Sequence, residues 1–126
     1  MQFIVHGHHL ELSDSLKARC RAHIYDRAER LIDDSAARLE IVLANHFGQK
    51  HGKGDMSCKI DLRAPGIAPI HVTETRPSMH EAIDLAADRL IEAIRRGVEK
   101  REDRRKHGDI RNLPLAEPAF RESEER

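Results

Sequence analysis

Hydrophobic residues recur every three or four positions in two segments of the chain, residues 13–32 and 78–98. Ser13 can cap a helix at the start of the first segment, and Ser78 with Glu81 forms a capping box at the start of the second. Each segment gathers its hydrophobic residues into one stripe, so we expect two amphipathic helices. The stripes contain Leu16, Cys20, Ile24, Ala28, Leu31 and Ile32, and then Met79, Ile83, Ala86, Ala87, Leu90, Ile94 and Val98.

Four other segments have the alternating pattern of strands. Residues 2–7 are a short β-rich run, and residues 39–44 alternate around Leu39, Ile41 and Leu43. Residues 56–64 alternate most clearly, with apolar residues at the even positions and polar residues between them. The fourth strand includes residues 70–72. A polar loop over residues 45–55 and a tight turn at residues 65–66 separate these strands.

The element order is therefore β-α-β-β-β-α, which predicts an α+β fold. A right-handed helical crossover makes the first two strands parallel, and the last three strands form a meander. Each helix has a single apolar stripe, so both should pack on one face of a four-stranded sheet. The other face stays open and carries Lys59, Asp61, Arg63 and His71. We expect residues 1–107 to form this domain and residues 108–126 to be a disordered acidic tail.

Composition limits the classes of function. The 126 residues carry no net charge, so total charge indicates neither a nucleic-acid nor a membrane partner. Aromatic residues make up only 3%, which argues against an aromatic platform for stacking bases. Neither a signal peptide nor a transmembrane segment is expected. Cys20 and Cys58 fall at inward positions and are expected to be reduced core thiols rather than a disulfide.

No enzyme motif is present in the sequence. A nucleophile elbow, a glycine-rich phosphate loop and paired carboxylates are all missing. Asp84 and Asp88 are one helical turn apart, and we expect them to form ion pairs with Arg89 and Arg95. Nine histidines are present, including His6, His8, His9 and His71, but their spacing matches no metal motif. We therefore expect no catalytic residues, no metal and no cofactor.

The end of the second helix is strongly basic. Between residues 89 and 107 there are eight lysines and arginines against four acidic residues. Such a helix, about 42 Å long over residues 79–106, outruns a strand of about 20 Å and should protrude from the sheet. Cations at a helix C-terminus can simply offset its dipole, but a local excess of positive charge is also what phosphate binding requires.

Several segments of the chain resemble the corresponding segments of the ribosome hibernation-promoting factor and ribosome-associated inhibitor family. This family is also called the sigma-54 modulation protein family. The similarity covers residues 1–107 and is most specific in residues 79–84, Met-His-Glu-Ala-Ile-Asp, and residues 88–90, Asp-Arg-Leu. It also includes residues 70–72 and the opening residues Met1, Gln2, Val5, Gly7, Ser13 and Leu16. The chain resembles the short members, which lack a separate C-terminal dimerisation domain.

The resemblance implies a non-enzymatic translation inhibitor in the bacterial cytoplasm, without a small-molecule substrate. It would bind rRNA and ribosomal proteins of the small subunit in the mRNA and tRNA channel, and promote hibernation under stress or in stationary phase. By position, the implied rRNA-binding residues are Arg89, Arg95, Arg96, Lys100, Arg101, Arg104 and Arg105. Two alternatives remain. One is a regulatory module that binds a protein through the open sheet face, and the other is a metal-binding protein that uses His6, His8 and His71.

Overall fold

A computed structural model describes residues 1–46 and 56–111 of the protein, with side chains up to Arg104. The predicted loop over residues 45–55 lies mostly outside this part, and the predicted tail lies outside it from residue 112 onward. The elements are β1 (Gln2–His8), α1 (Asp14–Cys20), η1 (Arg21–Tyr25), α2 (Asp26–Leu31), β2 (Arg38–Asn45), β3 (Met56–Arg63), β4 (Ile70–Arg76) and α3 (Met79–Arg111).

The first helix of the prediction is a continuous helical segment formed by α1, η1 and α2. Ser13 caps it, because the Leu16 amide donates a hydrogen bond of 3.2 Å to Ser13 Oγ. The middle part, η1, has π-helical hydrogen bonding, and the residues at both of its boundaries keep right-handed helical dihedral angles. The segment ends where Ile32 takes an extended conformation.

The four strands form one sheet in the order β1-β2-β3-β4. Strands β1 and β2 are parallel, and the other two pairs are antiparallel, as the sequence pattern predicted. The register places Phe3, Leu39, Leu62 and Ile70 in one row across the sheet. Because side chains alternate along a strand, this row and the row two residues further on face the same side.

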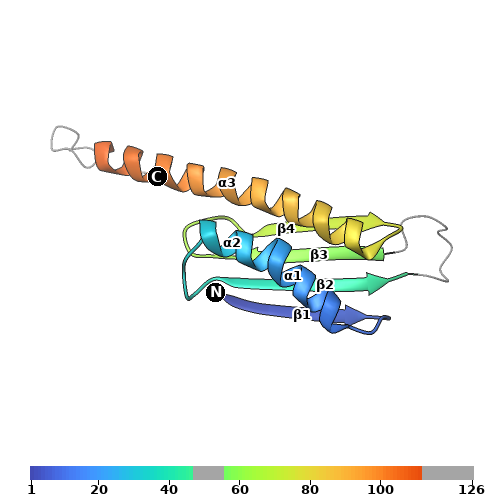
Figure 1. Cartoon of the computed structure of the whole chain (residues 1–126). Coiled ribbons are helices and arrows are strands. Elements are labelled where there is room, and N and C mark those ends of the chain that lie inside the picture. Colours follow the sequence, from blue (N-terminus) through green and yellow to red (C-terminus); the bar gives the residue numbers. More distant parts are fainter. Residues whose placement is uncertain (47–55, 112–126) are drawn as a thin grey trace.

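The first helical segment and α3 both pack on that side of the sheet and leave the other side open (Figure 1). The core between them is aliphatic, and its largest fully buried side chains come from helices and strands alike: Ile24, Leu39, Ile41, Leu43, Ile60, Leu62, Ile83, Leu90 and Ile94. Cys20 and Cys58 are also fully buried free thiols. Burial raises the pKa of Cys20 to about 12 and raises the pKa of Cys58 as well, so both stay protonated.

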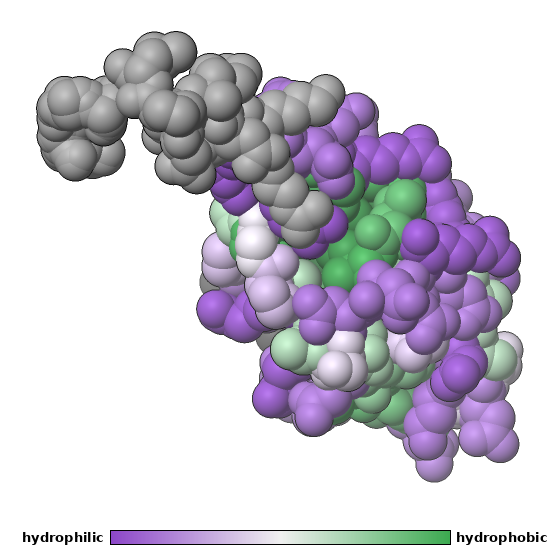
Figure 2. Space-filling model, turned by 90° about the vertical axis from the view of Figure 1, so that its left-hand side faces the viewer, coloured by the Kyte–Doolittle hydropathy of each residue, from purple (hydrophilic) through white to green (hydrophobic). Residues whose placement is uncertain are grey.

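Helix α3 is much longer than the sheet that it covers. Its 33 residues span about 50 Å, whereas the seven residues of β4 span about 23 Å. The helix continues to Arg111, four residues beyond His107. Its C-terminal part projects past the sheet on the side where β3 turns into β4 (Figure 1). Seen from this end, hydrophilic side chains surround a smaller apolar area (Figure 2).

Candidate nucleic-acid interface

The basic residues of α3 lie on different sides of the helix. Arg89, Arg96 and Lys100 are spaced seven and four residues apart, so they share one side. Arg89 contacts Glu74 of β4, which shows that this side faces the β4 edge of the sheet. We call these three residues the β4-side flank.

Arg89 is the member of the flank with a structural partner. Glu74 points toward the helices from β4, and its side chain is only 7% exposed. Its carboxylate forms an ion pair with Arg89 and lies 3.4 Å from the guanidinium of Arg76. A buried carboxylate needs such partners, so the charge of Arg89 is partly used within the fold.

Arg96 and Lys100 are the freely accessible members of the β4-side flank. The Arg96 side chain is 65% exposed, and its nearest carboxylate, that of Glu92, is 3.7 Å away and itself 72% exposed. Lys100 is exposed and forms no ion pair within residues 1–46 and 56–104. These two cations are therefore available to an external anion.

Arg95 is exposed on the side of α3 that faces the first helical segment. Asp84 and Asp88 share this side, because they precede Arg95 by eleven and seven residues. The expectation that these two aspartates pair with Arg89 and Arg95 is wrong.

The partners of the two aspartates come from the first helical segment instead. Arg19 donates hydrogen bonds of 2.8 and 3.2 Å to Asp84, and Arg27 donates one of 3.0 Å to Asp88. The hydrogen bonds from Arg19 lower the pKa of Asp84. These ion pairs fix the first helical segment beside α3 and remove two arginines from the exposed positive charge.

Arg101 and Arg104 continue the core-facing side of α3 beyond the last hydrophobic residues. Arg104 donates a hydrogen bond of 2.6 Å to the carbonyl oxygen of Gly66, in the turn between β3 and β4. The stem of Arg101 packs over the same glycine, and its Nε is buried without a hydrogen-bond partner. Both residues hold the turn against the helix. The side chain of Arg105 lies outside the described residues.

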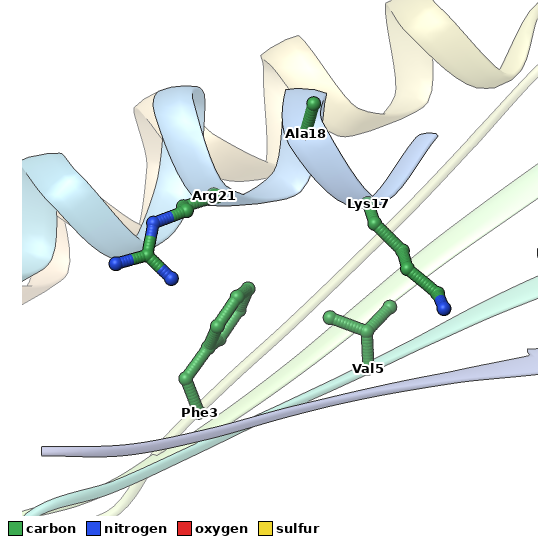
Figure 3. Close-up of a pocket in the computed structure, with 5 residues that line it drawn as sticks. All are labelled: Phe3, Val5, Lys17, Ala18 and Arg21. Atoms are coloured by element: carbon green, nitrogen blue, oxygen red, sulfur yellow. The ribbon is translucent and has the colours of Figure 1, made fainter. Parts of the chain in front are cut away.

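The sequence interpretation did not single out two exposed cations in the first helical segment. Lys17 and Arg21 are one turn apart and face a groove between α1 and β1 (Figure 3). Phe3 and Val5 of β1 and Ala18 of α1 complete the lining. The four-residue spacing of the two cations is visible in the sequence. The groove that they border forms only when α1 packs over β1, so the sequence alone does not show it.

The histidines of the open face are too widely separated for the proposed metal site. His6 is on β1 and lies 3.1 Å from Glu40, whereas His71 is on β4 and pairs with Asp61. The two strands are opposite edges of the sheet, about 14 Å apart at the usual strand spacing. A site formed by His6, His8 and His71 together is therefore wrong. Among residues 1–46 and 56–104, no three His, Cys, Asp or Glu side chains are grouped to hold a metal.

A comparison with models of known protein families gives a match that covers most of the chain. The family model for the sigma 54 modulation protein / S30EA ribosomal protein matches residues 3–102. The chain belongs to this family. The match overlaps all six of the predicted helices and strands and includes the whole β4-side flank. Members of the family are not enzymes, and we assign no catalytic residue to the chain.

Solved structures share the fold. The N-terminal domain of Protein Y from Thermus thermophilus is 25% identical, with a TM-score of 0.62, and the match covers 76% of this chain and 98% of that domain. A ribosomal subunit interface protein from Coxiella burnetii is 15% identical, with a TM-score of 0.58, and the match covers 76% and 96% of the two chains. A search of curated proteins finds no match. No described helix is long and apolar enough to cross a membrane.

Proposed function

We propose that the protein binds the small ribosomal subunit in the channel used by mRNA and tRNA and thereby inhibits translation in idle ribosomes. Family membership and the name of the Coxiella relative support a ribosomal partner. The channel, the hibernation role under stress and the location in the bacterial cytoplasm are parts of the proposal. The observation that carries it is the projecting helix α3 with the exposed cations Arg96 and Lys100 on its β4-side flank.

In the proposed complex, α3 supplies the main contacts to rRNA. Arg96 and Lys100 bind phosphate oxygens, and Arg95 adds a contact from the side of α3 that faces the first helical segment. Such contacts recognise the shape and backbone of RNA rather than its sequence. The folded body then occupies the space that mRNA and tRNA need. Arg89, Arg101 and Arg104 contribute mainly by fixing α3 to β4 and to the β3–β4 turn.

Sedimentation with purified small subunits tests this assignment. The double variant Arg96→Glu/Lys100→Glu should keep the fold, because both side chains are exposed. We expect it to lose binding at moderate salt, since each reversed charge replaces a phosphate contact by repulsion. Binding that equals the unmodified protein would overturn the role of the flank.

The open sheet face provides a matched control. Lys59 and Arg63 are exposed on β3, on the side away from the helices, and changing both to Glu alters the net charge by the same amount. The variant Lys59→Glu/Arg63→Glu should still sediment with the subunit. If this variant loses binding and the α3 variant keeps it, the sheet face is the binding surface, as the alternative of a protein-binding module requires.

A further inference from the structure

A groove separates α1 from the edge strand β1. Its volume is about 360 Å³, and it is open to solvent. Phe3 and Val5 rise from β1 toward the helix (Figure 3), and Ala18 of α1 also lines the groove. Lys17 and Arg21 reach out on the two sides of this apolar centre (Figure 3). The groove thus combines an apolar interior with two cationic side chains.

The aromatic residues of the described chain meet beside this groove, which Phe3 lines. Residues 1–46 and 56–111 contain only two of the aromatic residues Phe, Tyr and Trp, namely Phe3 and Tyr25. Their ring centroids are 4.8 Å apart, and the guanidinium carbon of Arg21 lies 5.1 Å from the Tyr25 centroid. The Tyr25 hydroxyl donates to Glu29 Oε2 at 2.9 Å. An overall aromatic content of 3% therefore conceals one local cluster of aromatic and cationic side chains.

The positive charge at the groove is not neutralised within the described part of the chain. Arg19 and Arg27, on the same helical segment, form ion pairs with aspartates of α3. Lys17 and Arg21 face the groove beside β1 instead of α3, and they form no ion pair with a carboxylate among the described residues. The fold thus neutralises the arginines that face α3 and leaves the groove cations available to an anion.

We propose that this groove holds one unpaired nucleotide of RNA. The base enters the apolar centre and contacts the ring of Phe3, while Lys17 and Arg21 bind the flanking phosphates. Where proteins bind single-stranded loops, bulges or ends of RNA, they do so largely through unstacked bases that lie on aromatic rings or guanidinium groups. This inference rests on the proposed function, because rRNA is the RNA that the protein would meet. It adds a second contact, beside the first helical segment, to those of α3.

Binding of the full-length protein to a fluorescent single-stranded oligoribonucleotide of about six nucleotides tests the groove. Phe3→Leu keeps an apolar side chain packed against the core and removes the stacking surface. Because stacking on an aromatic ring contributes about 1–3 kcal/mol per base, we expect affinity to fall by about 5- to 150-fold. Arg21→Glu should also weaken binding and lower the slope of log K against log salt by about 0.7.

Arg30→Glu is the matched control. Arg30 is exposed on the same helical segment, about 14 Å further along, and the change in charge is identical. It should bind the oligonucleotide at least fivefold more tightly than Arg21→Glu. Equal weakening by the two variants, or unchanged affinity of Phe3→Leu, overturns the nucleotide site.

Two probes test other occupants of the groove. A synthetic peptide of residues 112–126, which is rich in acidic residues, should not distinguish the unmodified protein from Arg21→Glu. Peptide binding that is lost in Arg21→Glu, with oligonucleotide binding retained, would assign the groove to the chain's own C-terminal segment. If AMP displaces the oligonucleotide when the two are present at equal concentrations, the groove would be assigned to a free nucleotide. Sedimentation of the unmodified protein with small subunits, measured in parallel, distinguishes failure of the groove from failure of the proposed function.

Discussion

Replacing Arg89 by Ala should destabilise the protein although Arg89 is on the surface. The Arg89 side chain is 65% exposed, but its partner Glu74 is only 7% exposed and sits between β4 and α3. After the replacement, the carboxylate of Glu74 keeps a single cationic neighbour, Arg76, at 3.4 Å. The variant thus leaves a buried charge with less compensation while the rest of the core is unchanged.

The size of the stability loss depends on the fact that only one partner of the pair, Glu74, is buried. Breaking a fully buried ion pair costs about 3–5 kcal/mol, whereas exposed pairs contribute about 0–1 kcal/mol. Arg89 is largely solvated and Arg76 remains, so we expect a loss of about 1–3 kcal/mol. Glu74→Gln in the same background should recover part of this loss, because it removes the uncompensated charge. The coupling between the two sites should be about 0.5–3 kcal/mol.

Urea unfolding followed by circular dichroism measures this effect, and Arg96→Ala is its control. Arg96 has the same exposed fraction of 65% on the same helix, but its partner Glu92 is 72% exposed. We expect Arg96→Ala to stay within about 0.5 kcal/mol of the unmodified protein. With a slope of about 1–3 kcal/mol per molar urea, a loss of 2 kcal/mol moves the midpoint by roughly 1 M. Equal midpoints for Arg89→Ala and Arg96→Ala would refute the structural role of Arg89.

Four further changes test how α3 packs against the rest of the fold. Ile83 is fully buried, so Ile83→Ala should cost about 2–5 kcal/mol in urea unfolding, and an unchanged midpoint would contradict its place in the core. Gly97→Ala should stabilise the protein by about 0.5–1 kcal/mol, because the new Cβ meets Ile67 at an ordinary contact distance of 3.5 Å. Gly66→Ala should destabilise the protein, since the φ angle of Gly66 is +86°. Asp84→Asn should cost up to about 1 kcal/mol at pH 7. The loss should shrink as the pH falls below the ordinary carboxyl pKa of 3.8 and disappear once Asp84 is protonated in the folded protein, because its lowered pKa means that the ion pair stabilises the fold only while the carboxylate is ionised. A loss that persists after protonation would show another cause.

Periodicity was sufficient to predict the fold because each element exposes a single polar side. The alternation from Met56 to Arg63 and the stripe from Met79 to Val98 fix which side chains face inward. The helical crossover between β1 and β2 favours parallel pairing, and the short connections favour a meander of the remaining strands. The end of α3 was harder to predict, since Gly108 does not stop the helix.

The partners of charged side chains could not be predicted in the same way. Arg101 and Arg104 look like solvated cations in the sequence, but their place on the core-facing side brings them onto Gly66. Asp84 is paired by Arg19, which is 65 residues away along the chain. Local spacing describes only neighbours on one helix, whereas these contacts depend on how two elements pack. The meeting of Phe3 with Tyr25 has the same origin.

Electron cryomicroscopy of the protein bound to small ribosomal subunits tests the central claim most directly. The account predicts density for the folded domain in the channel of mRNA and tRNA, with Arg96 and Lys100 of α3 against rRNA phosphates. The first helical segment should also lie near RNA, and the open face of the sheet should point away from the closest rRNA. Density outside the channel, or a complex in which Lys59 and Arg63 of the sheet form the main contact, would contradict it.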